Sequence, residues 1–495
     1  MFKTTVGDLL NAIPYSSFFG DINVEISGIT CDSNKVEPLN VFAALKGFRQ
    51  DGRIYAKSAV EKGATAILSY ADPLEDFPYR NISWIVCQND RLSFSMASSF
   101  LYPIMGKKTK LVGVTGTNGK TTIVYLLRSI FNTCGGGAIL STVEYDDNQF
   151  LKPAERTTPE ADFINRWLCK LSELEIPYAA MEVSSHSIEL HRVSSLQFDA
   201  VGFTNLTRDH LDFHKTMENY FEAKKKLFSL LKKEGFSVIN IDNDYGLRLV
   251  SEIANQNIIK VGTASSADIF AEDVSITLEG IKATVNTQIG KIQVDSNLTG
   301  RYNLTNILFA IAFSIGFNIK KEFIEEGIKK FTGVSGRLQR VDAGQNFYLF
   351  VDYAHTDDAL KNVLFNLKPL VKGKLITVFG CGGDRDKTKR PLMGAVSAKL
   401  SDVIILTTDN SRSEDPDEIA KDIEPGIFSE LNNSKIYLKE LDRREAIKKA
   451  INLASEGDVI LIAGKGHERT QTIKGNVIPF HDPTVALEIL LESKK

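Results

Sequence analysis

Residues 111–122 read Leu111-Val-Gly-Val-Thr-Gly-Thr-Asn-Gly-Lys-Thr-Thr122. A short β-branched run leads into a glycine-rich loop, and residues 123–131 then carry apolar side chains at helical spacing. These segments together form a phosphate cradle, because the backbone N–H groups of a glycine loop and the N-terminus of the following helix both attract an anion. The order predicts that Lys120 reaches the β- and γ-phosphates of a nucleotide and that the Thr121 hydroxyl binds Mg²⁺.

The spacing of this motif is shorter than the strict Walker pattern. That pattern places its first glycine where this chain has Val114, and what is present is Gly116-Thr-Asn-Gly-Lys-Thr121. So short a pattern also arises by chance in loops that bind nothing. The flanking strand and helix favour the phosphate-binding interpretation over that alternative.

Length and composition limit the classes of protein to consider. A chain of 495 residues is typical of about three domains, and its net charge of −3 offers no global basic field for nucleic acid. The five cysteines have neither metal nor redox spacing, which indicates reduced thiols in a cytoplasmic protein. The N-terminus lacks the apolar core of a signal peptide, and no apolar run is long enough to cross a membrane.

The alternation of apolar patterns predicts an α/β protein with three domains. Residues 1–108 form a small N-terminal α/β domain. Residues 109–332 form a central domain with a parallel sheet and the mononucleotide-binding phosphate loop, and its residues 267–296 alternate as antiparallel ribbons do. In residues 333–495 strands alternate with helices, which predicts a Rossmann-like domain with a mostly parallel sheet.

Polar side chains follow two predicted strands of the central domain. Glu182, Ser184 and His186 come after one strand, and His210 lies in the loop after the next. Parallel strands present their carboxyl ends at one edge of a sheet. A carboxylate and an imidazole there, beside a phosphate loop, suit a Mg²⁺-nucleotide site. Without the phosphate loop and Glu182, a hydrogen-bonded loop histidine would be the favoured explanation of His210.

Three consecutive lysines occur at 224–226 within a predicted helix. A solvated basic face is the usual explanation for such a run, but three successive residues cannot share one helical face. Lys224 lies one turn from both Tyr220 and Phe228. We therefore expect Lys224 near the buried side of the helix.

Each predicted strand of the third domain is followed by a polar loop. These loops are Asp352-Tyr-Ala-His355, Gly380-Cys-Gly-Gly-Asp-Arg-Asp386, Asp409-Asn-Ser-Arg412 and Gly464-Lys-Gly-His-Glu468. The second loop has glycines like those of a dinucleotide fingerprint. Asp384-Arg-Asp386 follows where that fingerprint needs its third glycine and a helix start, so we reject a nicotinamide site.

The motifs, taken in order, resemble those of the Mur ligase family over essentially the whole chain. The residues that carry the resemblance are Gly116-Thr-Asn-Gly-Lys-Thr121, Met181-Glu-Val-Ser-Ser-His186, Thr204-Asn-Leu-Thr-Arg-Asp-His210, Asp352-Tyr-Ala-His355 and Gly464-Lys-Gly-His-Glu468. Within the family, Asp32-Ser33, residues 379–386 and Lys389-Arg-Pro-Leu-Met-Gly394 resemble the branch that adds the third residue of the peptidoglycan stem peptide.

The resemblance implies an ATP-dependent amide ligase that uses Mg²⁺. ATP would phosphorylate the D-glutamate γ-carboxylate of UDP-N-acetylmuramoyl-L-alanyl-D-glutamate, and the amine of meso-diaminopimelate would attack the acyl phosphate. By the same resemblance the three domains bind UDP, ATP and the incoming amino acid in chain order. The partners are small molecules, with no nucleic acid and no membrane insertion, and the protein is expected to be a monomer.

The resemblance also implies a role for individual residues. The catalytic residues are Lys120, Lys224, His210 and Glu182. The Mg²⁺ ligands are Thr121, Glu182, His210 and Lys224, the last as a carbamate (N6-carboxylysine). The ATP-binding residues are Gly116, Thr117, Asn118, Gly119, Lys120, Thr121, Thr122, Asn303, Arg337, Asp352 and His355. The residues for the UDP-sugar dipeptide are Ser33, Thr157, Thr158, Ser184 and Arg192.

The loop that selects the amino acid resembles the Asp-Asn-Pro-Arg of diaminopimelate-adding relatives. Here it reads Asp409-Asn-Ser-Arg412, and Ser411 in place of proline is expected to loosen the loop. An arginine can clamp a distal carboxylate, which L-lysine lacks, so diaminopimelate is favoured and L-lysine remains the alternative. A surface turn near Pro416 also explains Arg412. The expected diaminopimelate-binding residues are Arg385, Asp409, Asn410, Ser411, Arg412, Gly464 and Glu468.

Two further functions stay open on the sequence. Folylpolyglutamate synthase shares the phosphate loop and the three-domain plan, but it needs neither Asp32-Ser33 nor the loop at 409–412. A regulatory P-loop ATPase would form no amide bond and would turn over ATP without a UDP-sugar.

Overall fold

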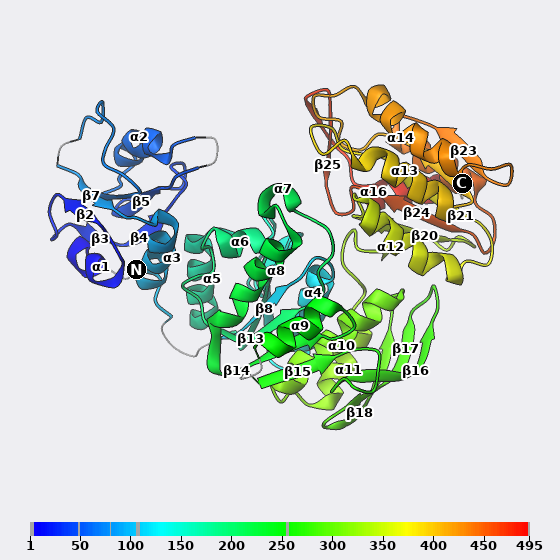
Figure 1. Ribbon diagram of the computed structural model, residues 1–495, viewed down its shortest axis with the longest axis horizontal. Coiled ribbons are helices and arrows are strands. Elements are labelled where there is room, and N and C mark those ends of the chain that lie inside the picture. The colour runs from blue at the N-terminus through cyan, green and yellow to red at the C-terminus, as the bar shows by residue number, and fades with distance from the viewer. Residues whose placement is uncertain (1–3, 48–49, 80, 105–108, 254–256, 494–495) are drawn as a thin grey trace. The chain divides into compact units, whose positions relative to one another are not determined.

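The computed structural model describes residues 4–47, 50–79, 81–104, 109–253 and 257–493 (Figure 1). The expected boundary at residue 108 lies outside these ranges. The chain divides into two compact units. The first unit is Met1–Ile269 with Phe309–Ile324, and the second is Phe270–Leu308 with Glu325–Lys495.

An eight-stranded sheet forms the centre of the first unit, in the order β11-β10-β9-β12-β8-β13-β14-β15. Its strands are β8 (Lys110–Thr115), β9 (Gly137–Leu140), β10 (Glu144–Asp146), β11 (Leu151–Pro153), β12 (Tyr178–Glu182), β13 (Phe198–Phe203), β14 (Leu231–Asn240) and β15 (Asn257–Val261). The run from β9 to β15 is parallel, and β10 and β11 extend it antiparallel. Because β8 lies between β12 and β13, the loops after these three strands meet at one edge.

Helices cover this sheet, and the first of them, α4, begins directly after the phosphate loop. The helices are α4 (Lys120–Thr133), α5 (Ala161–Glu173), α6 (Ser185–Glu189), α7 (Leu211–His214), α8 (Met217–Lys225) and α9 (Asp244–Glu252), with the 3₁₀ turn η2 (Lys226–Leu230). The residues of α10 (Arg301–Gly316) and of α11 (Lys321–Lys330) are divided between the two units. The helix predicted over 123–131 is confirmed as α4. Apolar side chains of α5, α8 and α9 share one core with Leu111, Val201 and Phe203 of the sheet.

A smaller sheet occupies the start of the first unit, in the order β2-β7-β6-β5-β4. Its elements are β2 (Ser17–Phe19), β4 (Gly28–Thr30), β5 (Asn40–Ala44), β6 (Ala66–Ser69) and β7 (Ser83–Val86), with α1 (Val6–Ala12), η1 (Gly52–Tyr55), α2 (Ala56–Glu61) and α3 (Asp90–Leu101). The short strands β1 (Thr4–Thr5) and β3 (Glu25–Ile26) pair separately. The strands from β4 to β7 are parallel, and β2 is antiparallel to β7.

The second unit contains a six-stranded sheet in the order β19-β20-β24-β21-β22-β23. Its strands are β19 (Gln339–Arg340), β20 (Tyr348–Asp352), β21 (Leu375–Phe379), β22 (Val403–Leu406), β23 (Ile436–Lys439) and β24 (Val459–Ala463). Only β19 is antiparallel to its neighbour in this sheet, which confirms the mostly parallel prediction. The ribbons predicted over 267–296 are confirmed as β16 (Phe270–Ile276), β17 (Ile281–Thr287) and β18 (Gly290–Ser296).

Helices pack on both faces of this sheet, as its continuous apolar strands require. The helices are α12 (Asp357–Leu367), η3 (Lys368–Leu370), α13 (Lys389–Leu400), α14 (Pro416–Glu430), α15 (Arg443–Leu453) and α16 (Asp482–Glu492). Apolar residues of α12, α13 and α14 share a core with Leu375 and Phe379, whereas those of α15 and α16 share one with Ile376 and Val378. The hairpin β25 (Thr470–Ile473) and β26 (Asn476–Pro479) lies outside the sheet.

The predicted α/β class is confirmed. Within the described ranges, no helix combines the length and the apolar character that a membrane crossing requires.

Candidate active site

The phosphate loop lies between β8 and α4 and has a strained backbone that glycine supplies. Gly116 has φ +144°, and a Cβ there would come within 1.9 Å of the Thr204 hydroxyl. Gly119 has φ +91°. The Lys120 ammonium donates to the carbonyl oxygens of Gly116 and Thr117, at 3.0 and 2.9 Å. The loop is therefore shaped for an anion, and its lysine already lies over it.

The loop after β13 supports the phosphate loop from beneath. Thr204 Oγ1 donates to the Asn118 carbonyl at 2.6 Å, and the Asn118 N–H donates to Asn205 Oδ1 at 2.9 Å. The Thr117 N–H donates to the Asn205 carbonyl at 2.9 Å. Thr121 and Thr122 are buried in the first turn of α4. The structure thus brings residues 116–122 together as one rigid loop.

Lys224 lies under this loop, on the buried face of α8. Its side chain is only 1% exposed, and its amine donates to the Gly116 carbonyl at 2.8 Å. The amine lies 4.5 Å from the centre of the Tyr220 ring. Burial, with the nearby charge of Lys120, lowers the pKa of Lys224 well below its usual value. The prediction that Lys224 faces the interior is confirmed, and a neutral amine is favoured there.

Tyr220 is a residue of this site that sequence reasoning did not assign to it. Its hydroxyl lies 3.4 Å from Thr117 Oγ1, so it links α8 to the phosphate loop. The sequence feature that could have identified Tyr220 was its spacing of one helical turn from Lys224. By contrast, Lys225 and Lys226 lie outside and pair with Glu252 and Glu189.

Glu182 ends β12 beside the loop and is 1% exposed. Its Oε1 accepts the Thr142 N–H at 2.7 Å, and its backbone carbonyl accepts Thr158 Oγ1 at 2.8 Å. Thr157 Oγ1 lies 3.1 Å from Thr142 Oγ1. The Ser184 N–H donates to Thr158 Oγ1 at 3.1 Å. The carboxylate is thus held by a backbone N–H, and the Thr158 hydroxyl contacts the backbone at this end of β12.

Arg192 and Ser33 extend this polar group. Arg192 Nη1 donates to the Thr158 carbonyl at 3.0 Å, and Nη2 pairs with Glu160 at 2.9 Å. Burial lowers the pKa of Arg192. The turn that contains Ser33 is tied to the Thr157 region through the exposed pair of Lys35 and Glu155, at 3.5 Å. The structure therefore gathers Thr157, Thr158, Ser184 and Arg192, with Ser33 on an adjoining turn.

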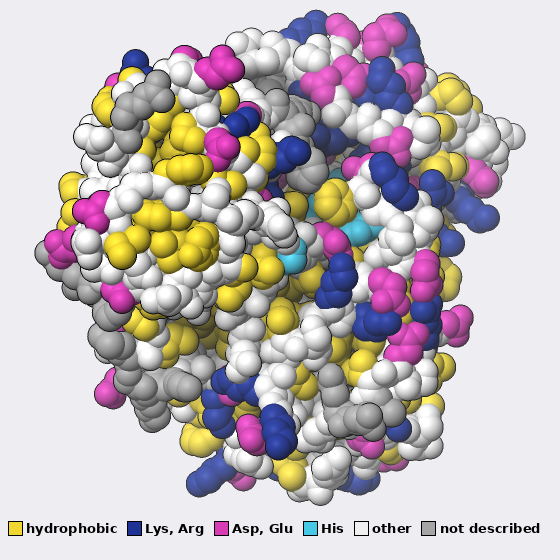
Figure 2. Space-filling model, turned by 60° about the vertical axis from the view of Figure 1, so that its left-hand side comes forward, with side chains coloured by type: hydrophobic (Ala, Val, Ile, Leu, Met, Phe, Trp, Pro, Cys, Tyr) yellow, Lys and Arg dark blue, Asp and Glu magenta, His cyan; other side chains and the backbone are white. Residues whose placement is uncertain are grey.

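His210 lies on the exposed side of the site, at the start of α7. Its φ is +54°, its side chain is 47% exposed, and its Nε2 lies 3.5 Å from Asp209 Oδ2. Histidine side chains are visible at the molecular surface in Figure 2. The ring meets the His186 ring edge-on at 4.8 Å, and burial lowers the pKa of both, to about 4 for His186. Both rings are consequently neutral near pH 7.

The oxygen donors of this unit fit Mg²⁺ that arrives with phosphate. Mg²⁺ in such sites is usually held by one or two carboxylates or hydroxyls together with substrate phosphate oxygens. The Thr121 hydroxyl and the Glu182 carboxylate are of that kind, whereas the Lys224 amine acts as a donor and cannot bind a cation unmodified. Among the described residues, no three His, Cys, Asp or Glu side chains are grouped to hold a metal alone.

In the second unit, polar residues gather around Tyr353 after β20. Asp352 is buried and accepts the N–H groups of Leu338 and Ala354 at 2.7 and 2.8 Å. Burial raises the pKa of Asp352, and Arg337 opposes this effect. The Arg337 guanidinium lies 4.9 Å from the Tyr353 ring centre, and the His355 ring lies 4.6 Å from it. Arg337, Asp352 and His355 are thus brought together.

Asn303 belongs to the same unit, in the first turn of α10. Its amide donates to the Thr299 carbonyl at 2.8 Å, and its Oδ1 accepts Asn306 Nδ2 at 2.9 Å. The charges of Asp352 and Arg337 act on the neighbouring Tyr302, whose pKa burial raises well above its usual value. Asn303 is therefore next in the chain to Tyr302, a residue on which the charges of the group around Tyr353 act.

The loop at 409–412 is buried and held firmly. Ser411 is fully buried, and a Cβ on Gly383 would come within 2.0 Å of its carbonyl oxygen. Arg412 has φ +51°, its Nη1 donates to the Gly383 carbonyl, and its N–H donates to the Thr472 carbonyl at 3.1 Å. Arg412 is half-buried in a turn, and hydrogen bonds from the loops after β21 and β25 fix this turn. The glycines after β21 allow this loop to approach closely.

The β25–β26 hairpin holds the loop that contains Ser411, and the expected loosening by Ser411 stays a prediction. The Thr472 N–H donates to Asn410 Oδ1 at 2.9 Å, and the Gly475 N–H donates to the Arg412 carbonyl at 2.8 Å. Gln471 Nε2 donates to the Asp409 carbonyl at 3.1 Å. Hydrogen bonds from a distant segment thus support this loop.

Two residues of this edge were missed by sequence reasoning. Lys465 is fully buried and contacts Asn410 and Glu468, and Arg443 donates to the carbonyls of Thr408 and Ala463. Lys465 belongs to the Gly464-Lys-Gly-His-Glu468 motif, and this position could have identified it as a site residue. No sequence feature pointed to Arg443. Arg385 is exposed, and the described residues show no contact that joins it to this group.

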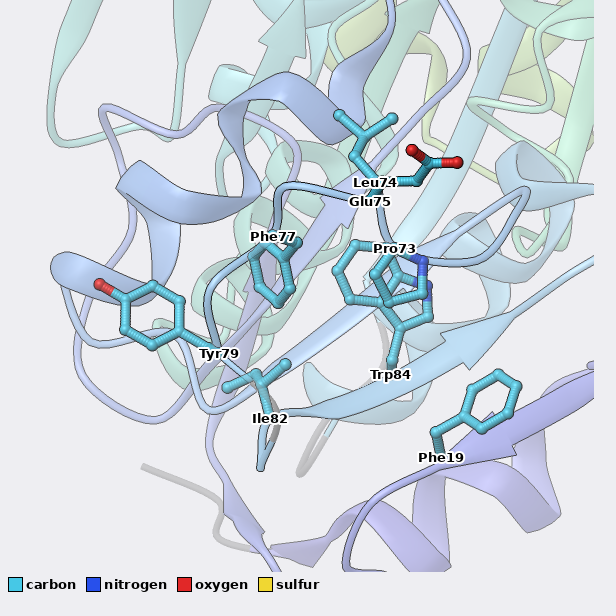
Figure 3. A pocket seen from close by; sticks show the side chains of 8 residues that line it. All are labelled: Phe19, Pro73, Leu74, Glu75, Phe77, Tyr79, Ile82 and Trp84. Carbon is cyan, nitrogen blue, oxygen red and sulfur yellow. The ribbon is translucent and has the colours of Figure 1, made fainter.

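An open pocket of about 250 Å³ lies elsewhere in the first unit (Figure 3). Its lining residues are Phe19, Pro73, Leu74, Glu75, Phe77, Tyr79, Ile82 and Trp84. The Phe77 ring lies 5.7 Å from Tyr79 and 5.2 Å from Trp84. With one carboxylate and no cation in its lining, this pocket does not suit a phosphate or a carboxylate.

Three family models match the chain in succession. They are described as the Mur ligase family catalytic domain, over residues 25–91, the Mur ligase middle domain, over 114–314, and the Mur ligase glutamate ligase domain, over 336–466.

Curated and solved relatives match nearly the full length. A UDP-N-acetylmuramoyl-L-alanyl-D-glutamate–2,6-diaminopimelate ligase of Caldanaerobacter subterraneus subsp. tengcongensis is 39% identical, and the match covers 99% of each chain. A solved structure with the same enzyme name has a TM-score of 0.71 at 30% identity and covers 100% of both chains. Folylpolyglutamate synthase from Mycobacterium tuberculosis has a TM-score of 0.61 at 15% identity, over 76% of this chain and 92% of its own, which shows a shared fold alone.

The sequence likeness is high and spans all three matched regions, and the phosphate loop and the polar strand ends lie where the motifs predicted. The chain therefore belongs to the Mur ligase family of ATP-dependent, amide-bond-forming enzymes.

Proposed function

We propose that this protein is an ATP-dependent ligase that joins meso-diaminopimelate to UDP-N-acetylmuramoyl-L-alanyl-D-glutamate, acting in the cytoplasm as a monomer. The observation that carries the proposal is the convergence of Lys120 and Lys224 on the Gly116 carbonyl of a phosphate loop next to Glu182. The 39% identical relative, which bears the name of this reaction, supports the choice of substrates.

The reaction would proceed in two displacements. The D-glutamate γ-carboxylate attacks the γ-phosphorus of ATP, which forms an acyl phosphate and releases ADP. The amine of the amino acid then attacks the acyl carbon, loses a proton and expels inorganic phosphate. Because two anions meet in the first displacement, cations must lie between them. The Lys120 ammonium over the phosphate loop supports that role.

Mg²⁺ would be held by the Thr121 hydroxyl and the Glu182 carboxylate. When bound, it neutralises negative charge on the transferred phosphoryl group. His210 would contribute a neutral imidazole, which its lowered pKa supports.

A carbamate on Lys224 would complete the set of oxygen ligands. A neutral amine adds to CO₂ and releases one proton, and the resulting carbamate carries one negative charge that its two oxygens share. The buried position and the lowered pKa of Lys224 favour the neutral amine that this addition requires. Its unmodified amine donates to the Gly116 carbonyl and supplies no oxygen ligand for Mg²⁺.

The choice of diaminopimelate over L-lysine depends on Arg412. A guanidinium can bind a carboxylate through two parallel hydrogen bonds, and the side chain of diaminopimelate ends in a carboxylate and an ammonium. Asn410 lies two residues from Arg412 in the chain and donates to Glu468, whose carboxylate would receive the ammonium. L-lysine offers the ammonium alone.

A phosphate-release assay tests the proposal against its rivals. Purified protein, ATP and Mg²⁺ are mixed with the UDP-dipeptide and either diaminopimelate or L-lysine, and in parallel with folate and glutamate. We expect phosphate release and a new amide product only with the UDP-dipeptide and diaminopimelate. Release without any acid substrate would instead support a regulatory ATPase, and release with folate would support folylpolyglutamate synthesis.

A further inference from the structure

We propose that Lys465 is a positioning residue that holds Asn410 and Glu468 for the incoming amino acid. Its positive charge also makes the site neutral overall, which favours a zwitterionic ligand. The proposal rests on the proposed function, because it concerns the amino acid that the ligase accepts. It assigns a role to a buried cation that touches neither ATP nor the UDP-sugar residues.

The three hydrogen-bond donors of the Lys465 ammonium are all used. Its side chain is fully buried after β24. Nζ lies 3.2 Å from Asn410 Oδ1, 3.0 Å from Glu468 Oε2 and 2.7 Å from the Thr470 carbonyl. An ammonium has three N–H donors, so this geometry leaves it one orientation. A lysine held in this way is a fixed part of the site.

Lys465 joins loops from strands that are not neighbours. Asn410 follows β22 and Glu468 follows β24, and β21 lies between these strands in the sheet. Asn410 Nδ2 donates to Glu468 Oε2 at 2.7 Å, which closes a triangle with Lys465. The amide orientation of Asn410 is set by its partners, since Oδ1 accepts from Lys465 and from the Thr472 N–H. The two loops therefore keep one relative position.

This arrangement leaves one carboxylate oxygen for a ligand. Oε2 of Glu468 accepts both Asn410 and Lys465, and within the described ranges no hydrogen bond reaches Oε1. Without Lys465, Glu468 would lose the one ion-pair partner that it has among the described residues, and the geometry that directs Oε1. An ammonium of the amino acid would then meet a carboxylate of undefined position.

The formal charges of the site also depend on Lys465. Lys465 and Arg412 are cations, and Glu468 and Asp409 are anions, so the four groups sum to zero. A neutral site suits the distal end of diaminopimelate, which carries one positive and one negative charge. Removing Lys465 leaves an excess negative charge, which favours the singly positive side chain of L-lysine. Lys465 thus contributes to selectivity as well as to geometry.

The test compares Lys465→Met with Lys449→Met, a lysine of the same unit whose side chain is 47% exposed in a surface ion pair. kcat and KM are measured for diaminopimelate, L-lysine, ATP and the UDP-dipeptide. For Lys465→Met we expect the KM for diaminopimelate to rise about tenfold or more, with both nucleotide KM values within about twofold. The ratio of kcat/KM for diaminopimelate over L-lysine should fall at least about fivefold. The control should match the wild type.

A double-mutant cycle separates positioning from general damage. If Lys465 acts through Glu468, Lys465→Met combined with Glu468→Gln should be about as impaired toward diaminopimelate as the worse single variant. Additive losses, or a fall of kcat alone with an unchanged selectivity ratio, would overturn the proposal. Should Lys465→Met not fold, Lys465→Gln keeps a donor in place of the cation, and an unchanged ratio in that variant would overturn it equally.

Measurements on the wild type distinguish a failure of the inference about Lys465 from a failure of the proposed function. If the wild type ligates neither amino acid to the UDP-dipeptide, the proposed function is wrong and this inference falls with it. If the wild type ligates diaminopimelate and the Lys465 variants retain its KM and selectivity, only the role of Lys465 is wrong.

Discussion

Lys120 and Lys224 donate to the same atom, the carbonyl oxygen of Gly116, at 3.0 and 2.8 Å. One lysine begins α4 and the other lies on the buried face of α8, more than a hundred residues later in the chain. Two amines on one acceptor cannot both carry a proton at low cost in a buried place. Burial, with the nearby charge of Lys120, lowers the pKa of Lys224 well below its usual value and so favours its neutral amine.

Lys224→Ala should lower the ligation rate at least about a hundredfold, because it removes the group that we propose as a carbamate ligand. Added short-chain carboxylate should restore part of the rate by entering the space that the side chain leaves. Ligation is measured as amide product formed with saturating substrates. Lys226→Ala is the matched control, since Lys226 forms an exposed pair with Glu189. Full activity of Lys224→Ala without rescue would exclude the carbamate.

Arg412→Ala should raise the KM for diaminopimelate by about ten- to a hundredfold, because hydrogen bonds to a charged group are worth about 1.5–3 kcal/mol. The KM for ATP should stay unchanged. Steady-state kinetics with each substrate varied in turn provide the measurement. Arg444→Ala, which removes an exposed arginine of α15, is the control. An unaltered KM for diaminopimelate in Arg412→Ala would remove the specificity argument.

Stability should fall as the pH decreases from about 6.5 to about 4, in part through His467. Burial, with the charge of Arg337, lowers the pKa of His467 from 6.5 to about 4. Below pH 6.5 His467 binds a proton in the unfolded chain but not in the folded chain. The stability present above pH 6.5 is therefore lost progressively until about pH 4.

Urea denaturation at several pH values measures this effect. The slope of unfolding free energy against pH should be smaller in His467→Gln than in the wild type, by less than one bound proton. Equal slopes in both proteins would show that another group accounts for the loss.

Asp482→Ala should destabilise the protein by about 3–5 kcal/mol, because it leaves the charge of Arg443 buried without its partner. Both side chains are fully buried, with Arg443 Nη2 2.7 Å from Asp482 Oδ2. Chemical denaturation is the measurement, and Glu488→Ala, on the exposed face of α16, should change stability by less than about 0.5 kcal/mol. A similarly small effect of Asp482→Ala would mean that the pair adds little.

Much of the fold and part of the site could be predicted from local sequence. The phosphate loop, α4 and the alternation of strands and helices in the second unit follow from residue patterns a few positions long. The inward position of Lys224 followed from its spacing to Tyr220 and Phe228, because one helical turn places such residues on a common face. The expected boundaries of the three domains and the roles of the site residues remain predictions.

Contacts between distant loops could not be predicted in this way. Ser411 was expected to loosen its loop because a serine is less rigid than proline, but the β25–β26 hairpin holds that loop through residues some sixty positions later. In the sequence, Lys465 was not distinguishable from the other polar residues of its motif. Its contact with Asn410 depends on the order of the strands in the sheet. Arg443, the first residue of α15, had no neighbour in the sequence that pointed to this edge of the sheet.

Local structure in this chain is determined by short-range sequence patterns, since backbone geometry and the periodicity of burial act over a few residues. The partners of Lys465, the shared acceptor of Lys120 and Lys224 and the contacts of the loop at Ser411 arise only when the strands take their places in the sheets. Those partners lie far apart in the chain, and only the packing of whole strands and helices brings their atoms within hydrogen-bonding distance.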